Sequence, residues 1–172
     1  MYSVDERDRV AELRDVPQSD VGAPCPLVLA SEGKLIVVYF VSNPREGWDG
    51  TKVTVVDPNA SAEPAAIVRF SQVTASMFGP PNDEAFSGHP LASRGLHPYG
   101  AFEVFDSSWV RRLERMNSVH PHHRPGSYAN PRHFVLAFHD STFECVARGY
   151  TCELAQGPLT ALIGRLSADL AG

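Results

Sequence analysis

The parity of apolar residues between positions 132 and 150 constrains the fold of this chain more than any other feature of its sequence. The bulky apolar residues lie first at even and then at odd positions: Phe134, Leu136 and Phe138, followed by Phe143 and Cys145. Successive side chains of a strand point to opposite faces, so one straight strand would turn its apolar side outward halfway along. A hairpin with Asp140-Ser141 at its tip removes this conflict, and Asp and Ser are common turn residues.

This hairpin assigns every side chain a face. The expected pairs share one apolar face: Phe138 with Phe143, Leu136 with Cys145, and Phe134 with Ala147. On the other face His139 and Glu144 become diagonal neighbours, and Ala137 opposite Glu144 leaves open space. A carboxylate that orients an imidazole prepares it for general-base catalysis. His139, Glu144 and the turn residue Asp140 are therefore candidate catalytic residues, and a solvated sheet face with one ion pair is the alternative.

The remaining elements predict an α+β fold, mainly an antiparallel sheet with a mid-chain helix, a C-terminal helix and two long irregular loops. A short N-terminal helix within 1–16 and an extended connector over 17–26 are expected to precede the sheet. The expected strands are 27–30 paired with 34–41, then 51–56, and 65–70 with a continuation toward 77. Asp106 or Ser107 can cap the mid-chain helix, and Pro158 suits the first turn of the C-terminal one. With 172 residues and no repeats, the chain is expected to form a single domain.

Two segments without a periodic pattern hold most of the histidines. Loops 79–100 and 118–131 together contain 36 of the 172 residues but five of the seven histidines. Long irregular stretches in a compact domain are often functional, and imidazoles bind zinc, iron, copper or nickel. His89, His120 and His122 are therefore candidate ligands of a divalent transition metal, and His89 is also a candidate catalytic residue. The spacing matches no established metal motif, so hydrogen bonding within the loops is the alternative.

Charge, hydropathy and cysteine content exclude several classes of protein. The net charge of −5 argues against nucleic-acid binding, which needs a broad basic surface. The longest apolar run, 35–41, is too short to span a membrane, and the charged N-terminus lacks the apolar core of a secretion signal. Cys25, Cys145 and Cys152 form no C-x-x-C pair, so reduced thiols and a cytoplasmic location are expected.

The segment from Arg111 to Arg124 is basic, whereas the chain as a whole is acidic. Its cations are four arginines accompanied by a single glutamate: Arg111, Arg112, Arg115 and Arg124. This segment is a candidate anion site or partner surface, and a solvated helix face is the alternative.

Two functions from different classes follow from these features. The first is a small enzyme or ligand-binding domain whose His/carboxylate site is formed by loops 79–100 and 118–131 and hairpin 133–148, with or without a metal. The second is a non-catalytic interaction or accessory module that uses the Arg111–Arg124 patch and the loop aromatics. These aromatics are Trp48, Phe86, Tyr99 and Tyr128. Convergence of the histidines in space would favour the first function.

Overall fold

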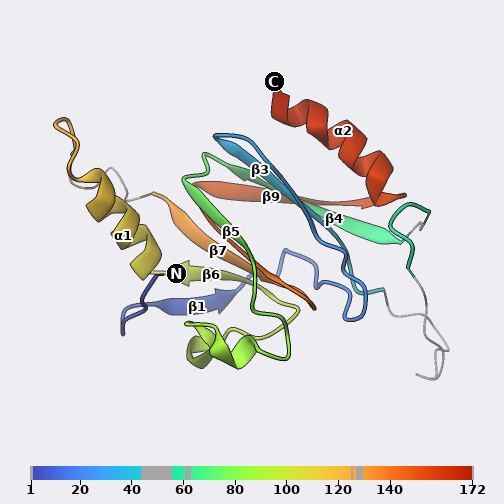
Figure 1. The fold of residues 1–172 in the computed structure, drawn as a ribbon, viewed down its shortest axis with the longest axis horizontal. Coiled ribbons are helices and arrows are strands. Elements are labelled where there is room, and N and C mark those ends of the chain that lie inside the picture. The colour runs from blue at the N-terminus through green and yellow to red at the C-terminus, as the bar shows by residue number, and fades with distance from the viewer. Residues whose placement is uncertain (1, 44–55, 61–62, 125, 127–129, 172) are drawn as a thin grey trace.

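The strands of this chain form two antiparallel sheets (Figure 1). The computed structural model describes residues 2–43, 56–60, 63–124, 126 and 130–171. The five-stranded sheet has the order β1 (Arg9–Glu12), β6 (Ala101–Phe105), β7 (Arg132–Ala137), β8 (Thr142–Ala147) and β5 (Ala75–Gly79). The four-stranded sheet has the order β2 (Leu27–Ala30), β3 (Lys34–Phe40), β4 (Pro64–Ser71) and β9 (Gly149–Gln156).

Two α-helices and two short 3-10 turns complete the described part of the chain. They are α1 (Ser108–Asn117), α2 (Leu159–Ala171), η1 (Phe86–Gly88) and η2 (Ala92–Arg94). Ser107 caps α1, since its hydroxyl oxygen accepts a hydrogen bond from the Val110 N–H at 3.3 Å. The expected α+β fold, with mainly antiparallel strands, a mid-chain helix and a C-terminal helix, is confirmed. Within the described residues, no helix has the length and apolar content that crossing a bilayer requires.

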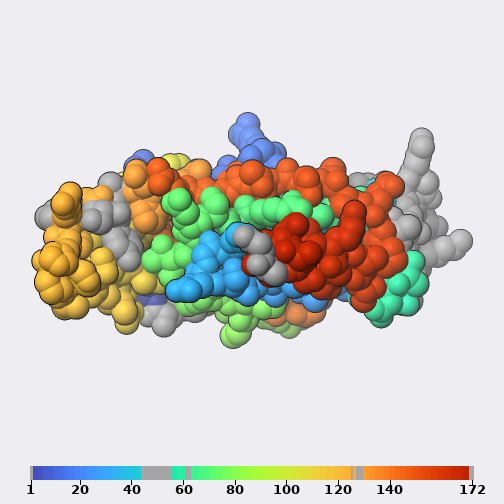
Figure 2. Space-filling view, turned by 90° about the horizontal axis from the view of Figure 1, so that it is seen from above, coloured from blue at the N-terminus to red at the C-terminus, as the bar shows by residue number. Residues whose placement is uncertain are grey.

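The molecule is layered, and its two sheets pack face to face. One buried cluster combines residues of both sheets, such as Val37 and Phe70 from one with Phe134 and Phe143 from the other. The outer face of the four-stranded sheet is covered by α2, which buries Leu159, Leu162 and Leu166 there. The outer face of the five-stranded sheet is covered by α1, the N-terminal segment and the turns η1 and η2. Figure 2 shows α1 at one end of the elongated molecule.

The hairpin expected from parity is confirmed, but its expected register is wrong by two residues. Leu136 pairs with Phe143, and Phe134 pairs with Cys145. The Phe138 N–H donates to the Ser141 carbonyl at 2.8 Å, so His139 and Asp140 form the tip. A shift by two keeps every side chain on its face, because side chains alternate with a period of two. Parity therefore predicted correctly which side chains share a face and left the register open. The alternative of a solvated sheet face is wrong, because β7 and β8 are buried on both faces, apart from Arg132.

Other expectations have mixed outcomes. The pairing of 27–30 with the strand that begins at Lys34 is confirmed. The N-terminal helix is wrong: strand β1 forms there instead and pairs with β6, because sheet pairing outweighs a weak helical spacing. The single strand expected from 65 toward 77 is two strands in different sheets, β4 and β5, separated by a turn with Gln72 at φ +51°. The expected strand 51–56 lies outside the described residues, apart from Val56.

Candidate functional site

A buried carboxylate, Glu144 on β8, accepts hydrogen bonds from three side chains that come from distant parts of the sequence. The Tyr2 hydroxyl donates to Oε2 at 2.6 Å, and His133 Nε2 lies 2.8 Å from the same oxygen. His89 Nε2 lies 3.1 Å from Oε1. All four side chains are buried. We call Tyr2, His89, His133 and Glu144 the Glu144 hub.

The second ring nitrogen of each imidazole is also hydrogen-bonded. His89 Nδ1 accepts from the Leu91 N–H at 3.1 Å, so Nε2 carries the proton and donates to Glu144. His133 Nδ1 lies 2.9 Å from the Ser107 hydroxyl, which can donate to it. Two imidazoles and a phenol thus satisfy one carboxylate. The hub is enclosed and its polar groups are paired, as a structural network requires.

The hydrogen bonds of the hub decide the charge of Glu144. Burial alone would raise the pKa of this carboxyl group, but the hydrogen bonds from His133, His89 and Tyr2 outweigh it and lower the pKa to about 2. Burial, together with the Glu144 charge, raises the pKa of the Tyr2 phenol well above its usual range. Glu144 is therefore ionised and Tyr2 is protonated at neutral pH.

The hub predicts an acid-dependent loss of stability. Because the pKa of Glu144 is lower in the folded state than the ordinary value of 4.5, its stabilising effect is complete above that pH and is lost as the pH falls toward 2. We expect the free energy of unfolding to fall by about 3 kcal/mol between pH 5 and pH 2 through this group. Urea unfolding across this range, on wild type and on Glu144→Gln, measures the difference. Parallel pH profiles for the two proteins would contradict the assignment.

The predicted contact between His139 and Glu144 is wrong, because the register places His133 and Ala137 diagonally across from Glu144. His139 Nδ1 lies 3.0 Å from Asp83 Oδ2 instead, and the Tyr99 hydroxyl donates to that same oxygen. The hydrogen bond from Tyr99 is the main cause that lowers the pKa of Asp83, whereas burial and Asp83 raise the pKa of Tyr99 to about 12.

The Asp83–His139 pair ties loop 79–100 to the hairpin tip. A carboxylate that holds one ring nitrogen leaves the other able to exchange a proton, so the arrangement is chemically suited to general-base work. Asp140 is 87% exposed, and its carboxylate lies 3.9 Å from His139 Nε2. Of the four candidate catalytic residues, His139 belongs to this pair and Asp140 lies beside it, while His89 and Glu144 belong to the buried hub.

The three histidines expected to bind a metal do not converge. His89 is buried in the hub, whereas His120 and His122 are exposed beyond the end of α1, with ring centroids 5.8 Å apart. Among the residues that the structure describes, no group of three or more His, Cys, Asp or Glu side chains could hold a metal ion. The donor geometry therefore gives no support to a metal site. The three cysteines are free thiols, and burial raises the pKa of Cys145.

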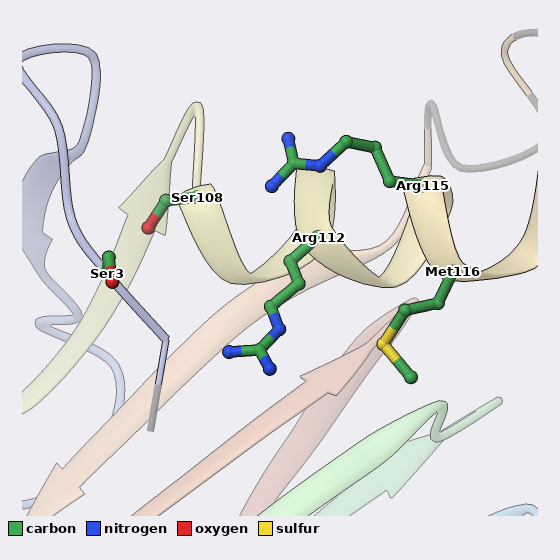
Figure 3. Close-up of a pocket in the computed structure, with 5 residues that line it drawn as sticks. All are labelled: Ser3, Ser108, Arg112, Arg115 and Met116. Atoms are coloured by element: carbon green, nitrogen blue, oxygen red, sulfur yellow. The ribbon is translucent and has the colours of Figure 1, made fainter.

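A cavity of about 440 Å³ lies between α1 and the N-terminal segment. Its lining residues are Ser3, Ser108, Arg112, Arg115 and Met116. Figure 3 shows the two guanidinium groups extending along α1 toward the side where the two serines lie. We call this the α1 cavity.

Ser108 is the one buried residue among the five that line the α1 cavity. The residue is 6% exposed, and its Oγ atom has no hydrogen-bond partner among the residues that the structure describes. Its N–H is already bound by Asp8 Oδ1 at 2.6 Å, so the start of α1 is capped from within the chain. The hydroxyl, and not the N–H at the start of the helix, is the polar group of Ser108 without a partner among the described residues.

The predicted arginine patch divides into two parts. Arg111 is neutralised by Asp5, at 2.7 Å, and lies 3.9 Å from Asp8. Arg112 and Arg115 line the α1 cavity, and Arg124 does not. Arg115 takes part in no ion pair within the part of the chain that the structure describes.

The sequence did not predict two residues of the hub, and the loop aromatics that it did predict have other roles or lie outside the described residues. Tyr2 gave no signal in the sequence, and His133 becomes a partner of Glu144 only in the observed register. Of the loop aromatics, Phe86 is buried and Tyr99 is bound to Asp83, while Trp48 and Tyr128 lie outside the described residues.

No protein-family model, curated protein or solved structure matches this chain.

Proposed function

We propose that this chain is a binding domain for a small molecule that carries an oxyanion, and that the oxyanion lies in the α1 cavity. The observation that carries the proposal is Ser108: its hydroxyl is buried without a partner among the described residues, and the residue lines the same cavity as Arg112 and Arg115. A buried hydroxyl without a partner costs about 1 to 3 kcal/mol, so such a group needs an explanation. A bound oxyanion supplies the missing acceptor.

The chemistry of the lining supports an anion over a neutral ligand. Arginine presents a planar set of N–H donors that matches the oxygens of a phosphate or carboxylate. Arg112 and Arg115 are three residues apart, so they lie on the same face of α1. Two carboxylates of the N-terminal segment, Asp5 and Asp8, are engaged by Arg111 and by backbone N–H groups.

The size of the α1 cavity supports a ligand larger than an inorganic ion. Its volume of about 440 Å³ falls within the range of small-molecule sites. Met116, which is 63% exposed, provides apolar surface on one side. The organic part of the ligand can pack there while its anionic group faces the arginines.

Neither the Glu144 hub nor the Asp83–His139 pair contacts the proposed ligand, because none of their side chains lines the α1 cavity. The hub is buried with its hydrogen bonds satisfied, which supports a structural role. Acid–base chemistry at His139 is a second candidate function, supported by the 3.0 Å contact with Asp83. The residues that line the α1 cavity do not include either of these two side chains.

Ser108→Ala tests the proposal through two opposite effects. We expect the unliganded protein to gain about 1 kcal/mol in stability, because an unpaired buried hydroxyl is removed. We expect its affinity for inorganic phosphate to fall about fivefold, because one hydrogen bond to the anion is lost. Denaturant unfolding and calorimetric titration at constant ionic strength measure the two quantities.

Ser19→Ala is the matched control. Ser19 is also buried with an unpaired Oγ among the described residues, but it does not line the α1 cavity. This variant should gain similar stability and bind phosphate as wild type does. An unchanged phosphate affinity in Ser108→Ala would remove the basis of the proposed site.

A further inference from the structure

The two serines of the α1 cavity each follow a residue that is held by the Glu144 hub. Ser3 follows Tyr2, whose hydroxyl donates to Glu144 Oε2 at 2.6 Å. Ser108 follows Ser107, whose hydroxyl lies 2.9 Å from His133 Nδ1. One buried carboxylate is therefore connected to both sides of the cavity, directly on one side and through an imidazole on the other.

Aromatic packing connects the same two sides. The Tyr2 ring stacks on Trp109 of α1 with the ring centroids 5.4 Å apart and the planes at 6°. Both rings meet the edge of His133, at 5.3 Å for Tyr2 and 5.1 Å for Trp109. The N-terminal segment is thus held against α1 by a stack and against β8 by a hydrogen bond. The position of Ser3 relative to Ser108 depends on both contacts.

We infer that the Glu144 hub sets the spacing of the Ser3 and Ser108 hydroxyls and thereby makes the α1 cavity selective for phosphate over carboxylate. This inference rests on the proposed function. Tyr2 is a positioning residue in it, because it acts on the ligand through Ser3.

The selectivity follows from the number of acceptor oxygens. A carboxylate has two oxygens in one plane, and one guanidinium group can satisfy both. A phosphate group has further oxygens outside that plane, so it can accept from the arginines and from the serine hydroxyls together. A phosphate group can therefore accept from more of the donors on the two sides of the cavity at once than a planar carboxylate can. A change in the position of Ser3 should therefore affect phosphate more than carboxylate.

Tyr2→Phe tests the inference, because it removes the hydrogen bond to Glu144 and keeps a ring that can stack on Trp109. The dissociation constants of inorganic phosphate and of acetate are measured for wild type and variant by calorimetry at constant ionic strength. We expect phosphate affinity to fall about fivefold, and acetate affinity to change less than about twofold. The ratio of the two constants is a readout that a general loss of stability would not change.

Leu162→Ala serves as the control for stability. Leu162 lies on α2 and packs against the four-stranded sheet, away from the hub on the five-stranded sheet, so this variant is destabilised without altering the hub. It should keep the wild-type preference for phosphate. Equal affinity ratios in wild type and Tyr2→Phe would overturn the positioning role while leaving the anion site in place. Failure of wild type to bind phosphate saturably would overturn the proposed function, and this inference with it.

Discussion

Replacement of Glu144 by glutamine is expected to lower the free energy of unfolding by about 3 to 5 kcal/mol, which is the largest effect on stability that we expect of a single conservative substitution in the described part of the chain. Glutamine has nearly the same shape but only one acceptor oxygen, and its amide nitrogen would face a donor of the hub. Tyr2, His89 and His133 donate to the two carboxylate oxygens, so at least one buried donor loses its partner. Urea unfolding at neutral pH measures the change.

Glu153→Gln provides the comparison at a surface position. Glu153 forms an ion pair with Arg69 at 2.7 Å, and its side chain is 57% exposed. Exposed ion pairs contribute little, so a change below about 1 kcal/mol is expected. If Glu144→Gln were no more costly than this control, the hub would not be an important source of stability.

Charge reversal of Arg115 is expected to have the largest effect on ligand binding. Arg115→Glu removes charge-assisted hydrogen bonds and adds repulsion, so phosphate affinity should fall by about 100-fold or more. The fold should be retained because Arg115 is exposed on α1. The dissociation constant of phosphate, together with the midpoint of urea unfolding, separates a lost contact from a lost fold.

Arg165→Glu is the matched control for that variant. Arg165 is also exposed on a helix, but it lies on α2, away from the α1 cavity. The change in net charge is identical, so a general electrostatic effect would weaken phosphate binding equally in both variants. Binding that is lost only in Arg115→Glu supports a local site, and equal losses would contradict it.

The sequence predicted the faces of the central hairpin well because side-chain alternation has a strict period. It did not predict the register, because a shift by two residues preserves every face. The shift matters chemically: it separates His139 from Glu144 and places His133 beside Glu144. The N-terminal segment was misassigned for a different reason. Its role as strand β1 depends on pairing with β6, which begins about ninety positions later in the chain.

The candidate site was predictable only in part. The excess of arginine drew attention to the segment that begins at Arg111, but charge alone could not show that Arg111 is neutralised by Asp5. Helical spacing places the α1 residues of the cavity on one face of the helix, because Arg112, Arg115 and Met116 follow Ser108 by four, seven and eight residues. Ser3 could not be added from the sequence, because its position depends on the contact of Tyr2 with Glu144.

The central claim, that the α1 cavity binds an oxyanion, is tested most directly by nuclear magnetic resonance of the arginine side chains. Inorganic phosphate is titrated into isotope-labelled wild-type protein at constant ionic strength, and the Nε–Hε signals are followed. If an oxyanion binds in the α1 cavity, the signals of Arg112 and Arg115 shift saturably with one dissociation constant, while those of Arg69 and Arg165 remain unchanged. Small, linear shifts of similar size at all four arginines would contradict it.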